Sequence, residues 1–330
     1  MKKLVKLFLL FIGVAVYGQN SLSIVDGEYG LETDFSLDVN LKTDTAIKAL
    51  QLDIKFDEQN FDYKSSYNLN KDRLGGSESD HVMTIKKIST SDSQTDKLRI
   101  LIYSPTNKII PTGDGKLFSA DFKTRKNNWG DHTFELMSVI ASKEDNTNLT
   151  LELVNGTIKI LAAFFDYNGN SQTGEPDVAD FGKIYKDENF SQTWQNLKNK
   201  GNHKLIISLN KNELTNFTLT KDGNPISWPI EVAPNSDYII NVAINTSKIA
   251  SFEESLFLES NHSYDNDNRK GVKEFKFKAE IYNENKVIVQ SNADAENNKT
   301  SKVKVSINGD ENITSFQFDI IPDQRIKMVA

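Results

Sequence analysis

The chain has 330 residues, of which 38% are hydrophobic and 26% charged, with a formal net charge of −7 and no cysteine. The length predicts two or three domains, and the composition is that of a globular protein and too apolar for a disordered one. The acidic balance disfavours nucleic acid as a partner, because phosphate binding needs clustered Lys and Arg. Without disulfides, the domains of an exported protein must be held together by core burial or by metal.

The first eighteen residues have the pattern of a secretory signal peptide. A lysine-containing start precedes an apolar run at 7–16, and Val16 and Gly18 are small enough for cleavage before Gln19. The run is shorter than the about 20 apolar residues that a membrane span needs, although an uncleaved signal anchor is the alternative. We expect residues 1–18 to be removed, no integral membrane segment in the mature chain, and a secreted or cell-surface location.

Short runs with apolar residues at every second position fill the segment 19–161. This period of two indicates strands with one buried face, and glycines between the runs suit turns with positive φ. Many short strands separated by turn signals predict an all-β domain built as an antiparallel β-sandwich. The clearest runs are Phe35, Leu37, Val39 and Leu41, then Leu50, Leu52, Ile54 and Phe56.

Three pieces of this segment carry a resemblance to a known family. They read FSLDVNLKTDTAIKALQLDIKFD, LRILIYSPTNKIIPTGDGKLFSADFK and VNGTIKI, in that order over residues 21–161. The segment resembles the cohesin domain, a β-sandwich of the jelly-roll type found in scaffoldins and in bacterial surface proteins. The resemblance implies a non-catalytic module, associated with polysaccharide breakdown through docking of dockerin-bearing proteins.

The chain also repeats itself, because residues 36–57 align without a gap to residues 302–323. The inward positions stay apolar throughout. This repeat predicts the truncated beginning of a second cohesin-like domain over 283–330, and hence that the sequence is a fragment; the alternative is that these strands extend the preceding sheet. Val39, Asp44, Ile47, Gln51, Asp53, Ile54 and Asp57 recur as Val305, Asp310, Ile313, Gln317, Asp319, Ile320 and Asp323.

Between the repeats, residues 203–282 alternate again in short runs. The phrase IEVAPNSDYIINVAIN, with Pro234 following a strand, and the later ESLFLESN resemble the immunoglobulin-like domains of bacterial surface proteins. We therefore expect an immunoglobulin-like β-sandwich over 203–282.

The segment 162–202 holds the one constellation with chemistry. Oxygen donors fall at positions 1, 3, 5, 7 and 12 of an EF-hand-type calcium loop, and apolar residues at helical spacing follow. The stretch resembles half of a dockerin module, which predicts a loop, an exiting helix and bound calcium. Ser171 replaces the glycine expected at position 6, no second loop follows, and an ordinary Asn-Gly turn is the alternative. The predicted ligand positions are Asp166, Asn168, Asn170, Gln172, Gly174 and Asp177.

No sequence motif for catalysis is found, and the four histidines lack zinc spacing, so we expect them in polar surface or loop positions. Trp129 is a weak candidate for stacking on a sugar, with a ring folded over a sheet edge as the alternative. The sequence thus predicts a non-catalytic extracellular binding module, for polysaccharide or for a dockerin-bearing or surface protein. A structural adhesin or spacer is the alternative function.

Overall fold

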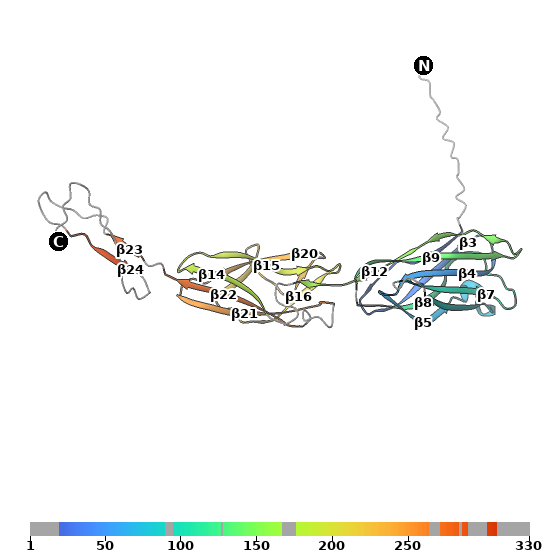
Figure 1. The fold of residues 1–330 in the computed structure, drawn as a ribbon, viewed down its shortest axis with the longest axis horizontal. Helices are drawn as coiled ribbons and strands as arrows, with labels where there is room; N and C mark the ends of the chain where they lie inside the picture. Colours follow the sequence, from blue (N-terminus) through green and yellow to red (C-terminus); the bar gives the residue numbers. More distant parts are fainter. Residues whose placement is uncertain are drawn as a thin grey trace, which may run out of the picture. The chain divides into compact units, whose positions relative to one another are not determined.

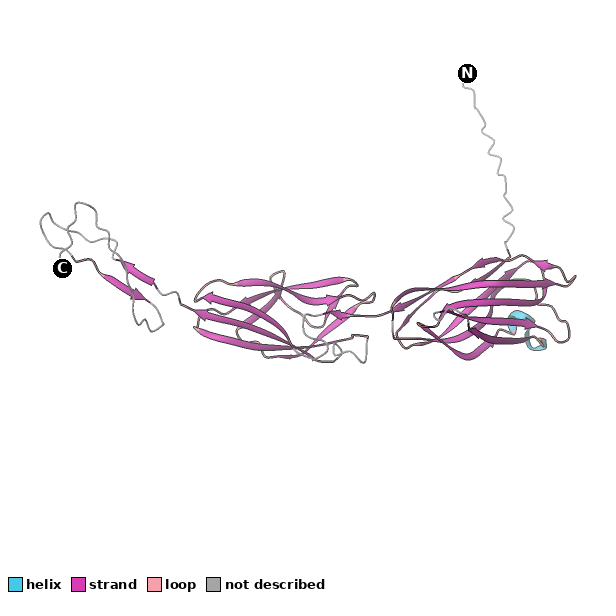
Figure 2. Ribbon diagram, viewed as in Figure 1, coloured by secondary structure: helices cyan, strands magenta, loops and turns pink. Residues whose placement is uncertain are grey.

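The structure is a computed structural model, and it describes residues 20–89, 95–126, 128–166, 176–263, 271–283, 286–289 and 302–308. The chain divides into two compact units: unit 1 is Met1–Phe164 with Gly201–Lys204, and unit 2 is Phe165–Lys200 with Leu205–Ala330. Nearly all regular elements are strands (Figure 1, Figure 2). The predicted all-β class is therefore confirmed.

Unit 1 contains a five-stranded sheet in the order β11-β1-β3-β8-β5. The contacts β1–β3, β3–β8 and β5–β8 are antiparallel, and β1–β11 is parallel. The strands are β11 (Glu152–Val154), β1 (Ser21–Ile24), β3 (Asp34–Thr43), β8 (Gly113–Thr124) and β5 (Phe61–Leu69).

The second sheet of unit 1 has seven strands, with the path β2-β12-β9-β4-β7-β6 and β10 paired to β9. Its central contacts, β9–β4, β4–β7 and β7–β6, are antiparallel. Two short 3-10 helices, Asp72–Leu74 and Gly76–Glu78, occur among the described residues of this unit, and no helix in the described part of the chain could span a membrane. The strands are β2 (Gly27–Gly30), β12 (Gly156–Leu161), β9 (Gly130–Lys143), β4 (Ile47–Asp57), β7 (Thr95–Tyr103), β6 (Val82–Ser89) and β10 (Asn148–Leu149).

The core of unit 1 lies between these sheets and follows the predicted alternation. Phe122 of β8 is fully buried at its centre, with ring centroids 5.8 Å from Phe35, 5.1 Å from Phe56 and 5.2 Å from Phe134. Because Phe35 and Phe122 come from the first sheet and Phe56 and Phe134 from the second, these rings join the two layers. The predicted β-sandwich is confirmed.

Unit 2 contains two five-stranded sheets over residues 165–282. The first has the order β13-β15-β20-β17-β18 and the second β14-β22-β21-β16-β19. Trp194 of the first sheet lies 5.3 Å from Phe275 and 5.1 Å from Phe277 of the second, between ring centroids, so the sheets face each other. The strands are β13 (Phe165–Asp166), β15 (Ser191–Asn199), β20 (Ser236–Ile244), β17 (Phe217–Lys221), β18 (Asn224–Pro225), β14 (Asp177–Tyr185), β22 (Lys273–Tyr282), β21 (Ala250–Ser260), β16 (Leu205–Asn212) and β19 (Ile230–Val232).

The prediction of a helix after Asp177 is wrong, and so is the prediction of a separate helical linker over 162–202. Asp177–Tyr185 is strand β14, which pairs in parallel with β22. Gly182 has φ +69 and lies in a bulge between Asp180 and Lys183, which shifts the strand register. The bulge puts Phe181 and Ile184 on the same inward face, three residues apart, and so imitates helical spacing.

Strand β15 contains a second bulge of this kind, between Trp194 and Leu197. Both residues are buried although they are three positions apart, a spacing that would place them on opposite faces of a regular strand. The second sandwich therefore begins at Phe165, earlier than the predicted boundary at residue 203. The resemblance to immunoglobulin-like domains stays a prediction.

Two short strands, β23 (Lys286–Val289) and β24 (Val305–Asn308), pair antiparallel in the segment predicted to open a second domain. Val289 pairs with Val305 as Ile24 pairs with Val39, and Lys286 pairs with Asn308 as Ser21 pairs with Lys42. Strand β24 thus matches 39–42 at the offset of the sequence repeat, and the pairing itself is repeated. Residues 309–330 lie outside the described residues, so the second domain stays a prediction.

Candidate functional site

The outer face of the four strands β6, β7, β4 and β9 is the most distinctive surface of unit 1. Cross-strand register aligns its side chains in rows that run across the sheet. We call this surface the β6–β9 face and define it by the outward side chains of these strands. Its principal members are Val82, Lys86, Lys97, Arg99, Leu101, Tyr103 and Ile140.

One half of the β6–β9 face is apolar. Tyr103 pairs with Val82 on one side, and the neighbouring row holds Leu101 and, across Gln51, Ile140. These four apolar side chains are between 36% and 46% exposed, and they make up half of the exposed large apolar residues among the described residues of unit 1. An exposed apolar cluster on a regular sheet surface is typical of an interaction site.

A bulge in β9 brings Ile140 into this cluster. Gln51 pairs with Ile140 and Asp53 with Met137, so β9 contains one more residue than β4 across this interval, and Ser138 has φ +50. The bulge changes which residues of β9 face outward, so that Ala141 enters the core and Ile140 faces solvent.

The other half of the β6–β9 face is basic. Lys86 pairs with Arg99, and Lys97 lies two residues from Arg99 on β7. Neither lysine has an ion pair within the part of the chain that the structure describes. In a chain with a net charge of −7, this half of the face is a local region of positive charge.

An ion pair between β4 and β7 lies within the basic half, where Asp53 pairs with Arg99 in the cross-strand register. Asp53 is 2% exposed, and its two carboxylate oxygens accept hydrogen bonds from Arg99 Nε at 2.8 Å and Nη2 at 2.9 Å. These hydrogen bonds and the charge of Asp53 raise the pKa of the Arg99 guanidinium. The arginine side chain remains 48% exposed.

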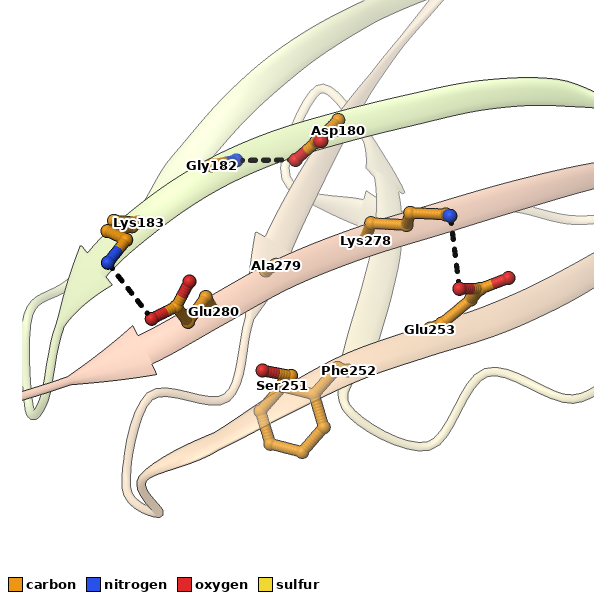
Figure 3. Close-up of a pocket in the computed structure, with 9 residues that line it drawn as sticks. All are labelled: Asp180, Gly182, Lys183, Ser251, Phe252, Glu253, Lys278, Ala279 and Glu280. Carbon is orange, nitrogen blue, oxygen red and sulfur yellow. Dashed lines mark hydrogen bonds and ion pairs between the residues drawn. The ribbon is translucent and has the colours of Figure 1, made fainter.

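Unit 2 has a shallow depression of about 310 Å³ on the outer face of β14, β22 and β21 (Figure 3). Lys183 Nζ lies 3.2 Å from Glu280, Lys278 Nζ lies 3.0 Å from Glu253, and Asp180 accepts a hydrogen bond from the Gly182 amide. The cross-strand charges therefore compensate one another. This pattern is typical of a solvated sheet surface.

The predicted calcium ligands are only partly described. Asp166 ends β13, and its Oδ2 forms an ion pair with Lys200 Nζ at 2.5 Å. Asp177 begins β14 and is buried. The other positions, Asn168, Asn170, Gln172 and Gly174, lie outside the described residues. Within the described residues no three His, Asp or Glu side chains are grouped as metal ligands.

The Trp129 ring stacks on Phe164 at 5.4 Å and packs on the core of unit 1. Its half-buried position matches a ring folded over a sheet edge, the alternative to sugar stacking. His81 and His262 lie in loops, which is one of the two predicted positions, but they are buried and not exposed. His132 is half-buried against Phe61, and burial lowers the pKa of both His81 and His132.

Comparison with solved structures gives similarity to cohesin modules. No protein family and no curated protein matches this chain. A cohesin in the Coh-OlpA–Doc918 complex from Clostridium thermocellum is 17% identical, with a TM-score of 0.36, covering 43% of this chain and 99% of that chain. The cohesin CaCohA2 from Clostridium acetobutylicum is 20% identical, with a TM-score of 0.34, covering 43% and 92%. A non-cellulosomal cohesin from the archaeon Archaeoglobus fulgidus is 15% identical, with a TM-score of 0.35, covering 44% and 92%. The chain is thus similar to cohesin modules, the class that its sequence resembles.

Proposed function

We propose that unit 1 is a non-catalytic docking module that binds a dockerin-bearing protein through the β6–β9 face. The observation that carries the proposal is the arrangement of an apolar half beside a basic half on one regular sheet surface. Protein interfaces combine an apolar centre with charged groups that fix orientation, and they are enriched in Tyr and Arg. The basic row fits an acidic partner surface.

Polysaccharide is the other occupant that the sequence suggests, and the aromatic side chains argue against it for unit 1. Trp129 and Tyr63 pack on the core. Tyr67 and Tyr103 are exposed, but they belong to different sheets. Sugar chains bind most often to rows of exposed rings, and the described residues of unit 1 form none.

For unit 2 we propose a spacer role. Its outer face between β14 and β21 is covered by paired charges, such as Lys276 and Lys278 on either side of Glu253. Compensated charges keep a sheet surface solvated and give a partner little to bind. We infer export of the protein from residues 1–18 alone, which lie outside the described residues.

The docking proposal is tested by capture on the immobilised chain from residue 20 onward. Extracellular proteins of the source cells are passed over it, eluted and sequenced, and polysaccharides are assayed in parallel. We expect captured proteins that share a dockerin module. Retention of polysaccharide alone, or of proteins with no common module, would contradict the proposal.

We further propose that the loop from Asp166 to Asp177 binds calcium. The oxygen donors at the predicted ligand positions suit a hard cation, and only two of these positions are carboxylates, so the affinity should be modest. Lys200 competes with the ion, because its ammonium group already pairs with Asp166.

Calorimetric titration of the chain with calcium is expected to give a heat that the Asp166→Ala/Asp177→Ala double variant loses. Lys200→Ala should tighten calcium binding several-fold, because Asp166 is then released, and Lys186→Ala serves as the matched control. Absence of heat at millimolar calcium in all four proteins would reduce the segment to an ordinary turn.

A further inference from the structure

We propose that Arg99 recognises a carboxylate of the docked protein and that Asp53 is the positioning residue that orients it. The proposal rests on the docking function assigned to the β6–β9 face. It identifies the chemistry of the partner at one point of that face: an Asp or Glu side chain.

The first step is the fixed orientation of the guanidinium. Asp53 lies directly opposite Arg99 in the β4–β7 register and holds it through two parallel hydrogen bonds. Asp53 is buried although it projects from the outward side of β4, because the arginine covers it. Such a two-point contact fixes the plane of the guanidinium, whereas a lysine at this position would remain a mobile point charge.

The second step is the set of donors that remains. A guanidinium has five N–H groups, and Asp53 accepts two of them. Within the described residues, Arg99 has no other hydrogen-bond partner, and its side chain is nearly half exposed. The remaining N–H groups, including both on Nη1, are therefore available in a fixed geometry that suits a second carboxylate.

The third step is the sign of the surrounding charge. Asp53 neutralises Arg99, so the pair alone would attract an anion only weakly. Lys86 and Lys97 flank Arg99, and neither has an ion pair among the described residues. They supply the positive field, and the adjoining apolar row with Leu101 excludes water once a partner covers it, which strengthens the polar contact.

The sequence repeat bears on Asp53 alone, because it covers residues 36–57 and not Arg99. Gln51 and Asp53, which face outward on β4, recur unchanged as Gln317 and Asp319, whereas the inward Leu50 and Leu52 recur as phenylalanines. Asp53 is thus one of the positions that the repeat keeps identical.

The test uses the captured dockerin-bearing protein as the probe and titration calorimetry on the full chain. Arg99→Lys keeps the charge but loses the two-point geometry, so we expect about 10- to 100-fold weaker binding with little change in melting temperature. Asp53→Asn keeps Arg99 but loosens its orientation, and we expect a smaller loss of about 5- to 10-fold. Arg125→Lys is the matched control, because Arg125 also pairs with an aspartate, Asp62, but away from the β6–β9 face.

The outcomes separate this inference from the docking function. If replacing Leu101 and Ile140 by aspartate abolishes binding while Arg99→Lys and Asp53→Asn bind as the wild type does, the inference about Arg99 is overturned and the docking function stands. If the aspartate variant also binds normally, both the inference and the docking function fail. Equal losses in Arg99→Lys and Arg125→Lys would likewise overturn a specific role for Arg99.

Discussion

Replacing Leu101 and Ile140 together by aspartate is expected to weaken binding of the docked protein by at least about 100-fold, or about 2.8 kcal/mol. Both side chains lie in the apolar row of the β6–β9 face, on either side of Gln51, and both are exposed in the unbound chain. Docking would bury the two new carboxylates without partners, and the desolvation cost would appear as faster dissociation. Titration calorimetry or surface plasmon resonance measures the change.

The matched control is Leu153→Asp/Val154→Asp. These residues are equally exposed and apolar, but they lie on β11 at the edge of the other sheet of unit 1. The control adds the same charge and should leave the affinity within about twofold of the wild type, since surface substitutions away from an interface have small effects. Equal losses in the two double variants would place the binding surface elsewhere.

Phe122→Ala is expected to destabilise unit 1 by about 3–5 kcal/mol, because it leaves a cavity at the junction of the two sheets. The ring is fully buried and contacts Phe35, Phe56, Tyr63 and Phe134. The transition of unit 1 in differential scanning calorimetry should fall by roughly 10 °C or more, while that of unit 2 stays unchanged.

Phe122→Leu keeps most of the volume and should cost only about 1 kcal/mol. If the stability of unit 1 falls from the wild type to Phe122→Leu and further to Phe122→Ala, the loss follows the packing volume that is removed. A loss below about 1 kcal/mol for Phe122→Ala would mean that the core of unit 1 does not depend on this aromatic cluster.

The strands of unit 1 could be predicted because each has one buried face and one solvated face. Leu37, Val39 and Leu41 are buried on β3 while their neighbours are more exposed, and Leu50, Leu52 and Ile54 are buried on β4 in the same alternation, with Asp53 as the one outward residue between them that is also buried. A period of two in the sequence is the direct record of that environment. The repeat at 302–323 was visible for the same reason, and β24 falls where the repeat predicts a strand.

Bulges explain why the sequence pattern led to a wrong prediction of a helix. Gly182 interrupts the alternation of β14, so that Phe181 and Ile184 both face inward and read as a helix. On β15, the bulge between Trp194 and Leu197 likewise leaves both side chains buried. A bulge leaves no reliable local signal, because the extra residue is defined by the partner strand.

The candidate site could not be predicted for a related reason. Alternation separates the two faces of a strand but does not say which exposed residues of neighbouring strands share a row. Leu101 reads as one more apolar residue of a β-rich run, and Ile140 would face the core if Ser138 did not bulge. The Asp53–Arg99 pair joins residues 46 positions apart and depends on the β4–β7 register.

Cysteine labelling tests the docking face most directly, since the chain has no cysteine of its own. Single cysteines are placed at Leu101, Ile140 and, as the control, Leu153, and their maleimide labelling rates are measured with and without saturating captured partner. The account predicts that labelling at 101 and 140 slows at least about tenfold, as expected for desolvated interface positions, and that labelling at 153 is unchanged. Protection at 153 alone, or at none of the three positions, would contradict it.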